Sequence, residues 1–197
     1  MTSAIHVEIT RFIIRSLILS IALLFAVSVS AQTRDHLTDA ETDLVRYWQE
    51  IDKRTEVFIK AADRRFAIIN GATAPPIKKA MKDEPDWGDV PKGTRAQLLG
   101  DIAGILDEAI NNIDNAATHN SKNPLIARAL RKLNNAANGY TQQLNSLKTK
   151  TTDPDEIAAI ERINDETKEI LDASGHLPSG AVEDEQADKK DKKKKPL

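Results

Sequence analysis

The sequence predicts an all-α protein, and three features of its 197 residues lead to this prediction. Apolar residues recur at spacings of three and four over long stretches, as expected for the buried face of a helix. Helix-capping residues stand before these stretches, and aromatic residues, which favour sheets, make up only 4% of the chain. We therefore expect an antiparallel bundle of four helices within residues 32–177. A core of three helices with the fourth packed outside is the alternative.

Residues 1–31 have the three parts of a secretory signal peptide. Two arginines precede an apolar run at residues 17–29, and small residues follow that run. We predict cleavage between Ala31 and Gln32. The remaining chain would then be exported to a periplasm or to the medium.

An uncleaved membrane anchor at residues 12–29 is the alternative for this leader. It would place Arg15 inside the bilayer, and the uninterrupted apolar run is shorter than the roughly 20 residues that a spanning helix needs. We therefore favour cleavage over anchoring in the inner membrane. The rest of the sequence contains no second stretch of this kind, so we expect no transmembrane helix in the mature chain.

The first helix is predicted over residues 38–69. Thr38 and Glu41 have the spacing of a capping box at its start, and Asn70 with Gly71 ends it. Acidic residues open this helix and three basic residues close it, which suits the helix dipole. The basic residues are Lys60, Arg64 and Arg65. The apolar stripe consists of Leu44, Trp48, Ile51, Thr55, Phe58, Ala62, Phe66 and Ile69.

The apolar face of this helix is wider than a narrow coiled-coil seam, because Val45 and Ile59 lie beside the main stripe. A face of this width is expected to contact two neighbouring helices, or one helix and a partner chain. The second arrangement would make the protein a homo-oligomer.

Residues 71–93 are predicted to form a long connection, because four prolines and three glycines interrupt any helical pattern there. A connection of this length is either functional or packed down by its own apolar residues. We expect Trp87 to be its anchor, with the acidic side chains around it in solvent.

Three further helices are predicted over about 94–118, from 123 onward and over 153–175. Asn123 and Asp153 are the expected N-caps, each followed by proline at the first helical position. Gly100 and Gly104 would allow the close approach of a neighbouring helix. Six asparagines on the second and third helices are interpreted as surface residues: Asn111, Asn112, Asn115, Asn134, Asn135 and Asn138.

Residues 178–197 have almost nothing apolar to bury, so a disordered tail is expected. An acidic patch comes first and a lysine-rich run follows. Such a run is attracted to anionic lipid headgroups or wall polymers, and a solubilising tail without a target is the alternative. The lysines are Lys189, Lys190, Lys192, Lys193, Lys194 and Lys195.

The sequence contains no motif for catalysis, a cofactor or a metal. It has no cysteine, and His36, His119 and His176 are far apart, so we expect them at the surface or at helix caps. The acidic run around Trp87 is not an EF-hand, because Pro85 and Trp87 occupy ligand positions. The carboxylates are expected mostly on outward helix faces, where they form solvated ion pairs.

These features predict an exported, non-enzymatic helical-bundle protein of the bacterial envelope, acting as a protein-interaction or structural module. Its partner would be an unidentified protein or an anionic envelope surface. The net charge of −2 argues against nucleic acid. The alternatives are a bundle that binds a small ligand or metal beneath residues 71–93, and a membrane-tethered sensor or adaptor if the leader is not cleaved.

Overall fold

A computed structural model describes residues 35–73, 77, 79 and 81–176. The predicted cleavage site at Ala31 and Gln32 and the lysine-rich run lie outside these residues. The described residues form five α-helices and no strand, which confirms the all-α class. The helices are α2 (Asp39–Tyr47), α3 (Ile51–Ile69), α4 (Arg95–His119), α5 (Pro124–Lys148) and α6 (Pro154–Ser174).

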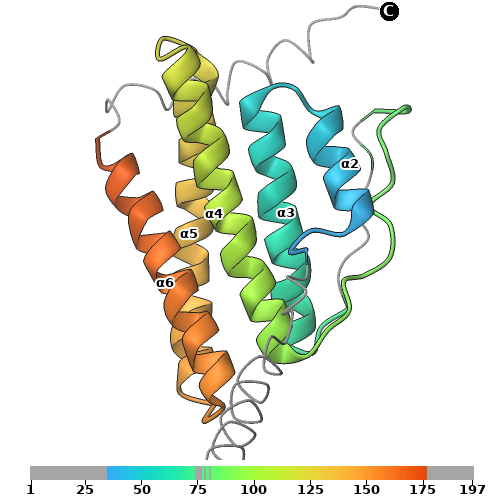
Figure 1. Cartoon of the computed structure of the whole chain (residues 1–197), viewed down its shortest axis with the longest axis vertical. Coiled ribbons are helices and arrows are strands. Elements are labelled where there is room, and N and C mark those ends of the chain that lie inside the picture. The colour runs from blue at the N-terminus through green and yellow to red at the C-terminus, as the bar shows by residue number, and fades with distance from the viewer. Residues whose placement is uncertain (1–34, 74–76, 78, 80, 177–197) are drawn as a thin grey trace, which may run out of the picture. The chain divides into compact units, whose positions relative to one another are not determined.

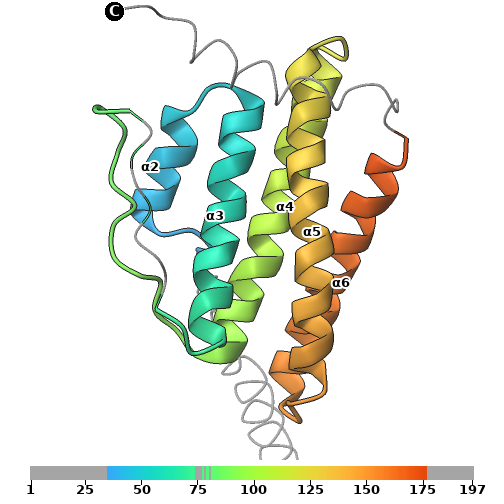
Figure 2. The same cartoon turned by 180° about the vertical axis from the view of Figure 1, so that it is seen from behind.

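The four long helices pack side by side and alternate in direction along the chain (Figure 1). Helices α3 and α6 each contact both α4 and α5, so these four helices surround one core. The short helix α2 lies outside this core and packs on α3, as the reverse view also shows (Figure 2).

The prediction of one continuous helix over residues 38–69 is wrong. Helix α2 ends at Tyr47, and α3 begins at Ile51 after Glu50 adopts an extended conformation. The Nε of Arg54 donates a hydrogen bond of 3.0 Å to the carbonyl of Trp48, which supplies that carbonyl with a partner outside a continuous helix. The break lets α2 turn back along α3 and bury Leu44 there.

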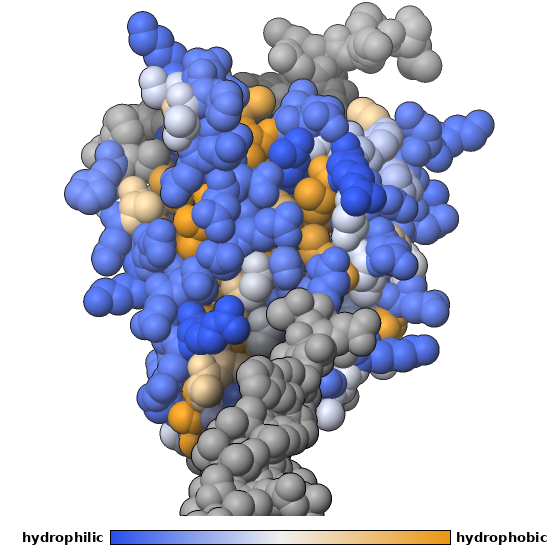
Figure 3. Space-filling model, viewed as in Figure 1, coloured by the Kyte–Doolittle hydropathy of each residue, from blue (hydrophilic) through white to orange (hydrophobic). Residues whose placement is uncertain are grey.

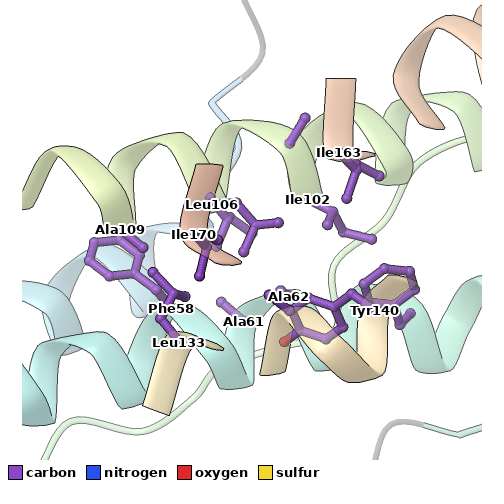
Figure 4. Close-up of a cluster of buried hydrophobic side chains, with 14 of the residues drawn as sticks. Phe58, Ala61, Ala62, Ile102, Leu106, Ala109, Leu133, Tyr140, Ile163 and Ile170 are labelled. Atoms are coloured by element: carbon purple, nitrogen blue, oxygen red, sulfur yellow. The ribbon is translucent and has the colours of Figure 1, made fainter. Parts of the chain in front are cut away.

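The predicted apolar stripes form the core. Most of their members are buried, and their side chains point toward one another from all four long helices (Figure 4). The labelled members are Phe58, Ala62, Ile102, Leu106, Leu133, Tyr140, Ile163 and Ile170, and Ala61 and Ala109, which were not among the predicted residues, pack with them. Because α3 already contacts α2, α4 and α5, its wide apolar face is covered within this chain.

The predicted caps are also confirmed. Thr38 and Glu41 form the capping box of α2, and Asn123 and Asp153 each accept a backbone hydrogen bond at the start of their helices. The start of α4 has a second capping box, formed by Thr94 and Gln97.

The face shown in Figure 3 is mostly hydrophilic, with hydrophobic side chains visible as small patches. Among the helices of the described residues, none has the length and apolar character needed to cross a membrane.

Candidate functional site

A cluster of buried charges joins α2, α3 and α4. The Glu41 side chain is fully buried, and its two carboxylate oxygens lie 2.8 Å from Nη1 of Arg64 and 2.9 Å from Nη2 of Arg65. The Nε of Arg65 also lies 3.4 Å from Oδ2 of Asp101 on α4. Each charge therefore has an opposite charge beside it, which a buried ionic group requires.

Most of the described carboxylates are exposed or half-buried, as predicted, and four are exceptions. Glu41, Asp52, Glu84 and Asp101 are all buried. Arg64 and Arg65 were expected to complement the dipole at the end of α3, but both are buried in ion pairs. Basic residues near the end of a helix can either face solvent and complement the helix dipole or form buried ion pairs. The sequence pattern did not distinguish these two arrangements.

Arg64 also fixes the end of the 71–93 connection. Its guanidinium donates to the carbonyls of Trp87, Gly88 and Asp89, at 2.9, 3.2 and 2.7 Å respectively. The Trp87 ring is buried and lies 5.6 Å from the Arg64 guanidinium, within the range of a cation–π contact. These contacts give Trp87 the position expected of an anchor.

Gly88 allows this segment to approach α2 closely. Its φ of +61° is a conformation that side chains disfavour, and a Cβ there would lie 2.6 Å from the Cβ of Ala40. Glycine at this position therefore allows the connection to pack against α2.

His36, which was expected at the surface or at a helix cap, is half-buried against α4. Its Nε2 is 2.7 Å from Oε2 of Glu108, and its ring packs over Gly104, where a Cβ would come within 2.9 Å. Gly104 thus accommodates an imidazole instead of a neighbouring helix, and a Cβ on Gly100 would have no neighbour within 4 Å. His119 and His176 are exposed.

The hydrogen bond with the Glu108 carboxylate raises the pKa of His36 above its usual 6.5, although burial opposes this effect. Asp35 also raises this pKa, and Arg65 lowers it. The raised pKa means that the pair stabilises the fold fully below about pH 6.5 and that this stabilisation is lost as the pH rises through the folded-state pKa.

We expect this loss to lower the free energy of unfolding by about 0.2–1 kcal/mol, because such partly exposed ion pairs contribute modestly. Urea unfolding of the wild type and of His36→Gln, from about pH 5.5 to about 8.5, measures it. The difference in stability between the two proteins should shrink as the pH rises. His119→Gln is the control, and a difference for His36→Gln that stays constant with pH would contradict the prediction.

A second ionic cluster joins α3 to α5. Lys132 contacts both Asp52, at 3.1 Å, and Glu56, and Nη1 of Arg128 lies 3.7 Å from Oδ2 of Asp52. Asp52 is buried, and its other oxygen, Oδ1, has no hydrogen-bond partner within the described residues. The cluster pairs charges between two core helices, so a structural role accounts for these contacts.

A cavity of about 530 Å³ opens at the end of the bundle where the α2–α3 turn, the last turns of α4 and the start of α5 meet. Its lining is Gln49, Glu50, Ile51, Arg54, Asn111, Asn112, Asn115, Ala116, Asn123 and Leu125. Asn111 and Asn115 are exposed, as interpreted from the sequence, Asn112 is half-buried, and all three line this cavity. Their spacing on α4 was visible in the sequence, but the other walls come from residues far away in the chain.

The space beneath the 71–93 connection is much smaller. Its volume is about 40 Å³, enough for one or two water molecules, and Glu84 and Trp87 form part of its wall. The Nε1 of Trp87 is buried without a hydrogen-bond partner in the described part of the chain. One alternative from the sequence was a small ligand bound beneath this connection. The space there is large enough for water molecules but not for such a ligand.

In the described ranges, no group of three or more histidine or carboxylate side chains is arranged to hold a metal ion. The chain matches no protein-family model, no curated protein and no solved structure.

Proposed function

We propose that this protein is an exported, non-enzymatic module of the bacterial envelope that acts by binding another protein. The observation that supports this proposal is a pair of exposed apolar side chains that precede and follow residues 87–89, whose carbonyls Arg64 holds. Among the described residues, the exposed large hydrophobic side chains are Met81 and Val90, which are 51% and 44% exposed. Burying these apolar side chains against a partner would contribute favourably to association.

The contacts of this segment favour binding. The carbonyls of residues 87–89 are held by the buried Arg64, and the hydroxyl of Tyr47 lies 3.6 Å from Sδ of Met81. A surface that is already ordered loses less conformational entropy when a partner binds. We therefore propose Met81 and Val90 as the centre of the protein contact. The lysine-rich run, Lys189 to Lys195, would add an electrostatic attraction to an anionic envelope surface.

Site-specific photo-cross-linking tests the contact. The full chain, expressed with its leader in a bacterial host, would carry p-benzoylphenylalanine at position 81 or at position 90. Position 161 on α6, an exposed glutamate, is the matched control. We expect discrete adducts of the same partner from positions 81 and 90 and none from 161. Absence of adducts at 81 and 90, or the same adducts from all three positions, would overturn the proposal.

The same preparation tests export. An intact mass that begins at Gln32, in the soluble exported fraction, is the expected result. A full-length mass in the membrane fraction would favour the alternative of a membrane-tethered adaptor.

A further inference from the structure

We propose that the cavity at the end of the bundle binds a small zwitterion with a carboxylate and an ammonium group, such as a short peptide with free ends. This site is separate from Met81 and Val90, so it does not rest on the proposed protein contact. Its volume of about 530 Å³ lies in the range of about 300–1,000 Å³ found for small-molecule sites.

Arg54 provides the contact for the carboxylate. Its Nε donates to the carbonyl of Trp48, and its Nη1 donates to Oδ1 of Asn112, each at 3.0 Å. The Nδ2 of Asn112 in turn donates to the carbonyl of Glu108, which fixes the amide. The guanidinium is thus held in place by neutral acceptors.

Arg54 has no carboxylate partner among the described residues, whereas Arg64 and Arg65 have short ion pairs. Its Nη2 makes no hydrogen bond in the same part of the structure. A guanidinium that is oriented at a cavity wall and has no carboxylate within ion-pair distance among the described residues can bind a ligand carboxylate, which can accept two of its hydrogen bonds. The cavity also borders the start of α5, the positive end of that helix dipole.

The opposite charge is also present. Glu50, at the start of α3, lines the same cavity, and Asn115 and Ala116 belong to the last turns of α4, the negative end of its dipole. A ligand with a single negative charge would leave this side of the cavity without a matching group. The presence of both signs therefore favours a zwitterion over a simple anion.

The rest of the lining suits a peptide. Asn115 makes no side-chain hydrogen bond within the described ranges, so its amide can pair with the backbone N–H or carbonyl of a ligand. Ile51, Ala116 and Leu125 supply apolar surface for small side chains.

Nuclear magnetic resonance titration of the full chain with trialanine tests this site. We expect the side-chain amide signals of Asn111 and Asn115 to shift with trialanine, and not with N-acetyl-trialanine amide, which carries neither charge. Equal shifts with the uncharged peptide, or no shifts with trialanine at about 10 mM, would overturn the proposal. At about 10 mM peptide, even binding with a free energy of only about −3 kcal/mol would be detected. N-acetyl-trialanine binding as tightly as trialanine would overturn the zwitterion assignment.

Three variants locate the site. Arg54→Gln removes the carboxylate contact. Asn115→Trp fills the cavity and leaves in place the hydrogen bonds of Arg54 to the Trp48 carbonyl and to Asn112, so it remains informative if Arg54→Gln unfolds. Each should weaken trialanine binding by about 10-fold or more, the effect of about 1.4 kcal/mol. Lys53→Gln removes a neighbouring charge that does not line this cavity and should leave binding unchanged. Retained binding in Asn115→Trp, or in a folded Arg54→Gln variant, would overturn the proposal.

Discussion

Glu41→Gln is expected to lower the free energy of unfolding by about 3–5 kcal/mol, the usual effect of removing one partner from a buried ion pair. Glutamine has the same shape as glutamate. Its amide oxygen can still accept the hydrogen bond that the backbone N–H of Thr38 donates to Oε2 of Glu41 at 3.0 Å. The substitution removes the negative charge that lies between two buried arginines. The loss therefore reports mainly on the charge of Arg64, which has no second carboxylate partner among the described residues, whereas Arg65 keeps Asp101.

Chemical unfolding followed by far-ultraviolet circular dichroism measures this loss. Asp43→Asn on the same helix is the matched control, because Asp43 forms an exposed pair with Arg46 and should contribute less than about 0.5 kcal/mol. Hydrogen exchange of residues 81–93 should also increase in Glu41→Gln, since Arg64 holds that segment as well. A loss below about 1 kcal/mol would contradict full burial of the cluster.

The helices could be predicted because their signals are local. The spacing of residues such as Leu106 and Ile163, and the caps at Asn123 and Asp153, involve neighbours within a few residues. The break between α2 and α3 could not be read in this way, because the apolar stripe continues through Trp48 and Ile51. The break is stabilised by Arg54, whose Nη1 bonds to Asn112, 58 positions away in the chain.

The candidate sites depend even more on long-range contacts. Trp87 stood out in the sequence because it is a large residue in a polar connection. Glu41 was recognised only as a capping residue, and its pairing with Arg64 and Arg65 requires α2 to lie against α3. Periodicity assigns a helical residue to a face, and only the packing of helices decides which charges meet there.

The end cavity shows the same limit. Asn111 and Asn115 lie one turn apart on α4, which the sequence does show. Arg54 joins them only because the α2–α3 turn, the end of α4 and the start of α5 meet at one end of the bundle. A sequence pattern that indicates a polar helix surface can therefore equally belong to a cavity wall.

Phe58→Ala is expected to lower the free energy of unfolding by about 3–5 kcal/mol, the range for removing a buried aromatic ring from a packed core. Phe58 is fully buried on α3, the helix that contacts α2, α4 and α5 (Figure 4). Phe58→Leu keeps most of the apolar volume and should lose less. Chemical unfolding measures both variants, and equal losses would contradict close packing around the ring.

This variant also separates packing from the buried charges. Phe58→Ala leaves Glu41, Arg64 and Arg65 in place, so residues 81–93 should stay as protected from hydrogen exchange as in the wild type while the folded state persists. Glu41→Gln should lose that protection at a similar global cost. If hydrogen exchange of residues 81–93 increased as much in Phe58→Ala as in Glu41→Gln, the position of these residues would depend on the whole core and not on the contacts of Arg64.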